Sequence, residues 1–299
     1  MISGQQKLIR LCVTLGSILI IIGAYVWWTK IYTNAENIFW GAFANNLATS
    51  SVTRTISDGP ENSDAANTQA MQLQLGGNNV VYSTRKNADG LGNSVTTESI
   101  TTPTESFIRL TNIRAAQHQI DASKLSSVVN VWAKDDTPLQ QGIKQDFLTG
   151  YAGNLPSLPI ANLDSKTRGE IVAYAKEHKA FSVDFKDVKA TKQDGRSART
   201  YTVKINPEGY VGLLKLVSQK VGTNHLADVD PVAYRNQEPL TEEITIDTLS
   251  RRVLTVKDSA GGYSETYSAY GVPVTTAVPS KGVITTSELQ NRLGQLLVQ

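Results

Sequence analysis

"ARTYTVKINPEGYVGLLKLVSQKVG", residues 198–222, contains the clearest change of hydrophobic period in the chain. Apolar and polar side chains alternate up to Ile205, which predicts a strand with one buried face. Asn206 is a suitable helix cap, Pro207 fits the first helical position, and Gly222 fits the end of the helix. The apolar residues in between recur at helical spacing: Tyr210, Leu213, Leu214, Val217 and Val221. A strand running directly into an amphipathic helix is the unit from which a sheet with a helical cover is built.

The surrounding sequence favours short strands joined by polar turns. Alternating or β-branched runs predict strands at residues 51–57, 69–77, 79–100 (a hairpin), 105–113, 127–133, 180–188, 242–247, 251–258 and 263–271. The hairpin has Asp-Gly turn chemistry at Asp89-Gly90. Helical spacing or capping residues predict helices at residues 34–51, 137–148, 164–179 and 286–297. Together these elements predict an α+β fold.

The predicted helix at residues 34–51 has a continuous apolar face. Asn34 is in position to cap it. Its apolar face consists of Ile38, Phe39, Ala42, Phe43 and Leu47. Such a helix packs on a core or lies along a membrane surface, and the second alternative requires basic flanks that this helix lacks. We therefore expect core packing.

Leu11–Trp28 contains no charged residue and ends in an aromatic pair. A membrane-spanning helix needs about 20 mostly apolar residues, whereas a cleaved signal has a shorter apolar region followed closely by small residues. An uncleaved anchor is therefore favoured over a removed leader. Lys7 and Arg10 precede the segment, which places them in the cytoplasm and exports the rest of the chain. We expect a cytoplasmic N-terminus (1–10), a transmembrane signal anchor (11–28), a juxtamembrane linker (29–36), an ectodomain (37–283) and a C-terminal amphipathic helix (284–299).

Composition limits the classes of function. The chain has 29 Lys and Arg against 27 Asp and Glu. Three of the bases precede Ile31 and no acid does, so the exported part has 26 bases against 27 acids, a net charge of −1. No basic stripe for nucleic acid is present. Cys12 is the only cysteine and the three histidines are far apart, so neither a disulfide nor a zinc site is expected. We expect no metal and no cofactor.

Two short motifs match catalytic or metal-binding patterns only formally. Ser83–Lys86 has Ser-x-x-Lys spacing, but on a strand these two side chains point to opposite faces. Residues 87–98 resemble a calcium loop, but Leu91 stands where a side-chain oxygen is needed, and strands flank the segment. The hairpin interpretation is favoured, and we expect no enzymatic activity.

The last third of the chain carries a resemblance to a known family. The segments are "ARTYTVKINPEGYVGLLKLV" (198–217) and "PLTEEITIDTLSRRVLTVKDSAGGYSETYSAYGVPVTTAVPS" (239–280). They resemble the LolA-like superfamily, and within it the LppX/LprG-type lipoprotein carriers. The resemblance runs over Asn37–Pro279, and its more specific part begins at Arg199. It implies a strongly curved antiparallel sheet, an incomplete barrel whose concave face is covered by helices that can enclose acyl chains. These relatives are lipidated or soluble, whereas this chain has a predicted span, so long-range shuttling is not implied.

Two functions follow as hypotheses. The first is a single-pass cell-membrane protein of a bacterial envelope, whose extracytoplasmic domain binds a lipid, lipoprotein or other amphiphile between sheet and helices. The expected lining of that cavity is Trp132, Phe147, Leu213, Leu214 and Val217. The same residues describe a solid core equally well, because sequence does not show missing volume. The second hypothesis is a non-enzymatic interaction or structural ectodomain that binds envelope proteins.

Overall fold

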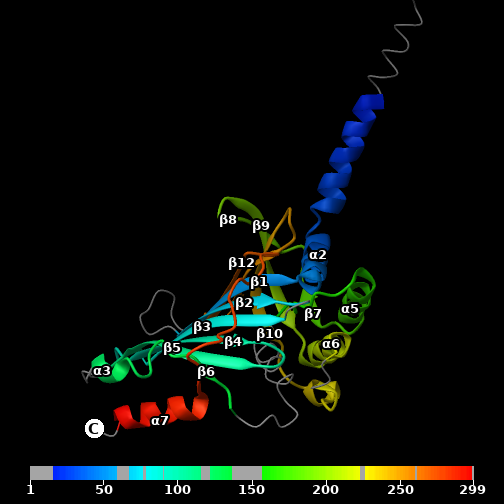
Figure 1. Ribbon diagram of the computed structural model, residues 1–299. Helices are drawn as coiled ribbons and strands as arrows, with labels where there is room; N and C mark the ends of the chain where they lie inside the picture. The colour runs from blue at the N-terminus through cyan, green and yellow to red at the C-terminus, as the bar shows by residue number, and fades with distance from the viewer. Residues whose placement is uncertain are drawn as a thin grey trace, which may run out of the picture.

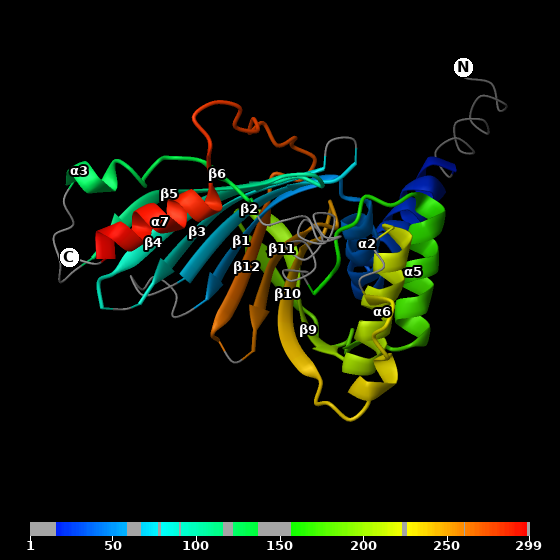
Figure 2. The same cartoon turned by 60° about the horizontal axis from the view of Figure 1, so that its bottom comes forward.

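The computed structural model describes residues 16–58, 67–76, 79–89, 91–115, 122–136, 157–222, 226–259 and 261–297. Within these ranges the strands form one 13-stranded sheet, in the order β13-β6-β5-β4-β3-β2-β1-β12-β11-β10-β9-β7, with β8 paired to β9. All neighbours are antiparallel except β13 and β6. The sheet curves strongly and does not close (Figures 1 and 2). The predicted α+β class with a curved, incomplete antiparallel barrel is confirmed.

The strands alternate with helices along the chain. The strands are β1 (Ser51–Asp58), β2 (Asn67–Gln74), β3 (Val80–Ala88), β4 (Ser94–Thr101), β5 (Ser106–Arg114), β6 (Ala133–Lys134), β7 (Phe181–Val183), β8 (Lys189–Gln193), β9 (Arg196–Ile205), β10 (Leu240–Asp247), β11 (Val253–Asp258), β12 (Tyr263–Ser268) and β13 (Ile284–Thr285). The helices are η1 (Trp27–Tyr32), α2 (Ala35–Ala48), α3 (Ala122–Leu125), α5 (Ser165–Glu177), α6 (Pro207–Lys220), η3 (Pro231–Tyr234) and α7 (Thr286–Leu297). In Figure 2, α2, α5 and α6 gather at one end of the sheet and α7 lies at the other.

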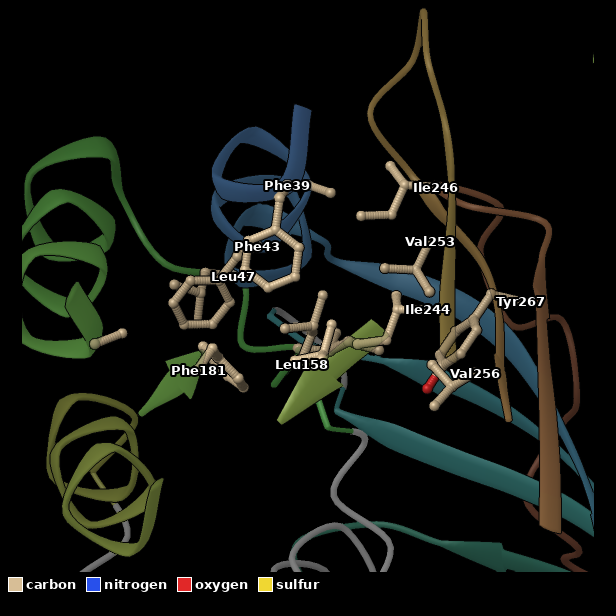
Figure 3. Packing of buried hydrophobic residues seen from close by; sticks show 14 of the residues in the cluster. Phe39, Phe43, Leu47, Leu158, Phe181, Ile244, Ile246, Val253, Val256 and Tyr267 are labelled. Carbon is tan, nitrogen blue, oxygen red and sulfur yellow. The ribbon is translucent and has the colours of Figure 1, made fainter. Parts of the chain in front are cut away.

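The largest apolar cluster lies between α2 and the sheet. Phe39 and Phe43 of α2 are fully buried and face Ile244 and Val253 on β10 and β11 (Figure 3). Each such side chain contributes about 1.5–3 kcal/mol through burial. The Asn34 carboxamide accepts the backbone N–H of Glu36 at 2.9 Å, so the predicted cap and the predicted core packing of this helix are both confirmed. We call the sheet face that carries Ile244 the concave face.

Helices α5 and α6 form the outer part of this layer. Asp164 caps α5 by accepting the backbone N–H groups of Lys166 and Thr167, as the sequence predicts. Pro207 begins α6, also as predicted. Asn206 occupies the capping position, but its side chain donates to the carbonyl of Lys179 instead of accepting from the helix. The predicted side-chain cap is wrong, because the amide group links α6 to the end of α5.

The predicted hairpin at residues 79–100 is confirmed as β3 and β4. The Asp89 carboxylate accepts the backbone N–H groups of Leu91 and Asn93 at 2.8 and 3.1 Å. Its oxygens therefore organise the turn, while Gly90 lies outside the described residues.

Two predicted strands are wrong in extent. The chain turns at residues 127–130 and the two-residue strand β6 begins only at Ala133, because Asn130 adopts a φ of 61°, which an extended strand excludes. At residues 180–188 only β7 is extended. The helix predicted at residues 137–148 lies outside the described residues.

The N-terminal segment is helical over residues 16–26 and continues into η1, which is π-helical. It leaves the body of the molecule as an isolated rod (Figure 1). Among the described residues, no helix combines the length and the apolar character that crossing a membrane requires. The predicted span begins at Leu11, and its first five residues lie outside the described part, so the anchor stays a prediction.

Candidate functional site: a buried polar cluster on the concave face

A group of polar side chains interrupts the apolar concave face where β1, β12, β11 and β10 follow one another in the sheet. Arg54 lies on β1 between Val52 and Ile56, which point to the same face because side chains alternate along a strand. Arg54 pairs directly with Tyr267 on β12, and Glu265 follows two residues away on the same face. This pairing places a basic and an acidic residue against each other across the strand boundary.

Arg54 and Glu265 form a two-point ion pair. The Arg54 Nε donates to Glu265 Oε2 at 2.8 Å, and Nη2 donates to Oε1. Arg54 is 4% exposed and Glu265 is 1% exposed. A buried charge is tolerated only when it is paired and its remaining hydrogen-bonding positions are occupied. The fork geometry of arginine satisfies both oxygens of the carboxylate at once.

Two tyrosines complete the surroundings of Glu265. The hydroxyl groups of Tyr263 and Tyr267 both donate to its carboxylate, and Arg54 Nη2 lies 3.0 Å from the Tyr263 hydroxyl. Burial raises the pKa of both tyrosine hydroxyls, and the neighbouring Glu265 raises it further. Burial lowers the pKa of Arg54, but the effects of Tyr267 and Glu265 outweigh it, so its net pKa is raised. At neutral pH the tyrosines are hydrogen-bond donors and Arg54 is a fixed cation.

Glu242 on β10 is the member of the group with an open hydrogen-bonding position. It lies on the same face as Ile244 and is 8% exposed. Burial raises its pKa, the Ser157 hydroxyl group lowers it by hydrogen bonding, and the nearby Glu265 raises it. Its Oε2 atom is buried and has no hydrogen-bond partner among the residues that the structure describes. Buried polar atoms without a partner are rare, and they occur where a water molecule or a ligand completes the site.

The chemistry of this polar cluster, consisting of Arg54, Glu242, Tyr263, Glu265 and Tyr267, is suited to binding. Each oxygen of Glu265 already accepts hydrogen bonds, so this carboxylate is poorly placed to act as a base or nucleophile. Among the described residues, no group of three or more His, Cys, Asp or Glu side chains could hold a metal ion. The cluster combines donors that Arg54 and the two tyrosines hold in fixed positions with one oxygen of Glu242 that can still form a hydrogen bond.

The structure brings only part of the predicted cavity lining together. Leu213 and Val217 lie one turn apart on α6, and both are buried in the core. Leu214, on the same helix, is half-buried and lies outside this cluster. Trp132 packs with Phe107 in a separate cluster, and the guanidinium of Arg109 lies 4.5 Å from the centre of its ring.

Trp132 therefore lies on the opposite face of the sheet from Leu213. Phe107 pairs with Ile100, which pairs with Tyr82, and alternation along β3 separates Tyr82 from the core residue Val81. Phe147 lies outside the described residues. The role of the predicted residues in ligand binding stays a prediction.

The sequence contains a signal for the polar cluster that a motif search does not detect. In "SVTRTIS" the arginine occupies the alternation site between Val52 and Ile56, and in "YSETYS" Glu265 lies between two tyrosines at the same alternation. A charged residue on the apolar side of a strand needs a buried partner. The partner is 211 residues away, so only the pairing of β1 with β12 identifies it.

Comparison with known proteins gives little further information. No family model matches the chain, and no curated protein matches it. Among solved structures, the crystal structure of LprF from Mycobacterium bovis is similar, with 11% sequence identity and a TM-score of 0.43. The match covers 82% of this chain and 97% of LprF. This likeness is too weak to support a functional conclusion, so the function proposed below depends on the chain's own geometry.

Proposed function

We propose that the chain is a non-enzymatic, membrane-tethered domain that binds an amphiphile, such as a lipid or the acyl group of a lipoprotein, on the concave face of its sheet. The observation that carries the proposal is the open position on Glu242 within the polar cluster. A buried carboxyl group with an unpartnered oxygen, bordered by apolar side chains, suits a ligand with a polar head and an apolar body.

The apolar part of the ligand would contact the residues that border the polar cluster. Met71 and Leu73 on β2 pair with Arg54 and Val52 of β1, and so they lie on the same face. Binding would gain about 25 cal/mol for each Å² of apolar surface removed from water, so an acyl chain supplies most of the affinity. The polar cluster would then select the head group through hydrogen bonds, since an unmatched buried polar group is costly.

The tether is the second part of the proposal. Leu19, Ile20 and Ile21 are among the exposed apolar residues of the N-terminal helix, with 66–73% of their surface accessible. Exposed contiguous apolar surface of this kind indicates contact with a partner or a membrane. The uncharged sequence that precedes this helix favours the membrane.

Native mass spectrometry of the full-length chain, purified from membranes in mild detergent, tests the binding. We expect a co-purified amphiphile that organic extraction releases. In Glu242→Gln the retained amount should fall several-fold, because the amide cannot reproduce both states of the carboxyl group. Glu243→Gln is the matched control, since Glu243 is the next residue on β10 and points to the other face. Protein that is repeatedly empty, or equal loss in both variants, would refute the proposal.

A further inference from the structure

Three segments meet at the end of the molecule from which the N-terminal helix leaves. They are the end of η1, the hairpin between β8 and β9, and the turn between β10 and β11 (Figure 1). The Tyr32 hydroxyl donates to the carbonyl of Leu249 in that turn at 3.0 Å. Thr33 lines a pocket of about 550 Å³ together with Lys192 and Arg199 of the hairpin. The base of the helix is therefore in direct contact with two loops of the sheet.

Two arginines attach the helix to the sheet. Arg199 of β9 donates to the carbonyl of Thr33 at 3.0 Å, and Arg251 donates to the carbonyl of Tyr32 at 3.1 Å. The Arg251 guanidinium also lies 4.6 Å from the centre of the Tyr32 ring. Carbonyl groups at the C-terminal end of a helix carry partial negative charge, so cations are favourable there. These contacts fix which surface of the body lies beside the helix.

That surface is basic. A second pocket of about 790 Å³ lies at the hairpin and the turn. The charged residues of this surface line one of these two pockets, except Arg251, which contacts the helix directly. The bases, which we call the basic collar, are Lys192, Arg196, Arg199, Arg251 and Arg252. The acids are Asp194 and Asp247, so five bases against two acids give +3. This value contrasts with the net charge of −1 from Ile31 onward.

Three cations of the collar point to solvent. Lys192, Arg196 and Arg252 are exposed, whereas Arg199 and Arg251 are half-buried against the helix. Asp247 is buried and accepts the backbone N–H groups of Leu249 and Ser250. One of the two acids is therefore buried, and the exposed charges of the collar, three bases against Asp194, sum to +2.

The collar lies at the level at which a membrane interface would begin. Trp27 and Trp28 are 50% and 43% exposed, and Trp28 stacks on Tyr32 with ring centres 4.9 Å apart. Exposed tryptophan and tyrosine at the end of an apolar helix are typical of the head-group region of a bilayer. Leu249, 57% exposed at the tip of the β10–β11 turn, adds an apolar side chain beside the same level.

We propose that the basic collar docks on the anionic phospholipid head groups of the bilayer that holds the N-terminal helix. The inference depends on the tether in the proposed function, and it adds a lipid class and an orientation. Each basic side chain near an anionic bilayer surface strengthens attraction about fivefold, and the effect disappears within a Debye length. With the helix fixed to the sheet, docking of the collar would hold the body in one orientation above the membrane.

Lipid composition around the full-length chain tests the docking. The chain is reconstituted in nanodiscs of phosphatidylcholine and phosphatidylglycerol at a ratio of about 4:1. Native mass spectrometry then counts the lipids that stay bound to the protein after it is released from the nanodisc. We expect phosphatidylglycerol to be enriched several-fold over the bilayer ratio. The triple variant K192Q/R196Q/R252Q should lose most of that enrichment, because each removed cation weakens the attraction to the anionic surface about fivefold. Raising the salt from about 0.15 to 1 M should reduce the wild-type enrichment as well.

A matched variant controls for total charge. K166Q/K204Q/K281Q also removes three positive charges, from exposed lysines that line neither pocket. It should keep the enrichment. Equal enrichment in all three proteins, or equal loss in both variants, would overturn the collar while leaving the tether intact. A chain that alkaline carbonate extracts from native membranes would overturn the tether, and the docking with it.

Discussion

Arg54 and Glu265 show how a charged pair is accommodated inside an apolar sheet face. The pair is held by two hydrogen bonds from the guanidinium and two from tyrosine hydroxyl groups. Replacing one member leaves the other charge buried, which costs more than the intact pair contributes. Any register of β1 against β12 that separates the two charges would therefore be penalised.

The first prediction concerns this pair. Arg54→Met should lower the free energy of unfolding by about 3 kcal/mol, because the buried Glu265 carboxyl group loses its cation and two hydrogen bonds. Urea titration of the full-length chain in mild detergent, followed by tryptophan fluorescence, measures the change. Arg85→Met is the control: Arg85 is exposed on β3, and its loss should cost less than about 0.5 kcal/mol. A loss for Arg54→Met as small as the control would contradict the account of the pair.

The second prediction concerns pH. Burial raises the pKa of Glu242 above its ordinary value of 4.5, so the folded chain holds this proton at pH values where the unfolded chain has released it. Stability from this group is therefore complete below pH 4.5, and it is lost as pH rises through the folded-state pKa. Glu242→Gln should remove that loss and be the more stable protein on the alkaline side. Unfolding measured from pH 4 to 8, with Glu243→Gln as the reference, tests the sign.

At the scale of elements, the contact between α5 and α6 depends on two glycines. A Cβ atom at Gly209 would lie 2.3 Å from the backbone carbonyl oxygen of His178, which cannot move without shifting α5. A Cβ atom at Gly212 would lie 2.3 Å from the Tyr174 hydroxyl oxygen, at the end of a side chain that can rotate away. The two glycines look alike in sequence, but a Cβ atom would meet rigid backbone at Gly209 and a movable side chain at Gly212.

The third prediction follows from this difference. Gly209→Ala should destabilise the protein by about 2 kcal/mol and Gly212→Ala by less, because overpacking is costly where the neighbour is rigid. Gly169→Ala on α5 has no atom within 4 Å of the new methyl group and should stabilise the helix by about 0.5–1 kcal/mol. Thermal unfolding of the three variants gives the order. Equal effects at Gly209 and Gly169 would show that the helices are not in contact as described.

The sequence predicted the elements whose hydrophobic period is unambiguous, including α2, α5, α6, α7 and most long strands. It failed where one residue overrides the period, as at Asn130, whose positive φ ends an apolar run that otherwise fits a strand. It also missed β8, because "KATKQ" has no apolar side and is held only by pairing with β9. Local pattern does not contain information about such pairing.

The candidate site was harder to predict than the fold. Leu213 and Val217 were recognised as inward-facing from their spacing on α6, and the structure buries both. The polar cluster was missed, since its members come from β1, β10 and β12 and meet only after the sheet has formed. Trp132 is predicted in the same lining, but the register of β3, β4 and β5 places its cluster on the opposite face of the sheet.

At the scale of the whole molecule, the sheet carries apolar clusters on both faces, and the helices cover its concave side at two ends. The α2, α5 and α6 layer lies at one end and α7 at the other, with the polar cluster on strands near the middle of the sheet order (Figure 2). The N-terminal helix and the basic collar lie together at one end of the body. This arrangement would place an amphiphile-binding face next to a bilayer.

The fourth prediction concerns which face binds. A photoactivatable fatty acid or phospholipid, added to the full-length chain and irradiated, should label concave-face side chains, above all those near Glu242 and Glu265, when the label is assigned to single residues by peptide fragmentation. Side chains of the opposite face, such as Tyr82 and Ile100, should be labelled far less. Glu242→Gln should lower the concave labelling, and Glu243→Gln should not.

The site of this crosslink, mapped by peptide mass spectrometry, tests the central claim most directly. The account predicts labelling that concentrates at the polar cluster and that an excess of unlabelled lipid displaces. Labelling that is confined to the N-terminal helix, or spread evenly over both faces and insensitive to competitor, would contradict it.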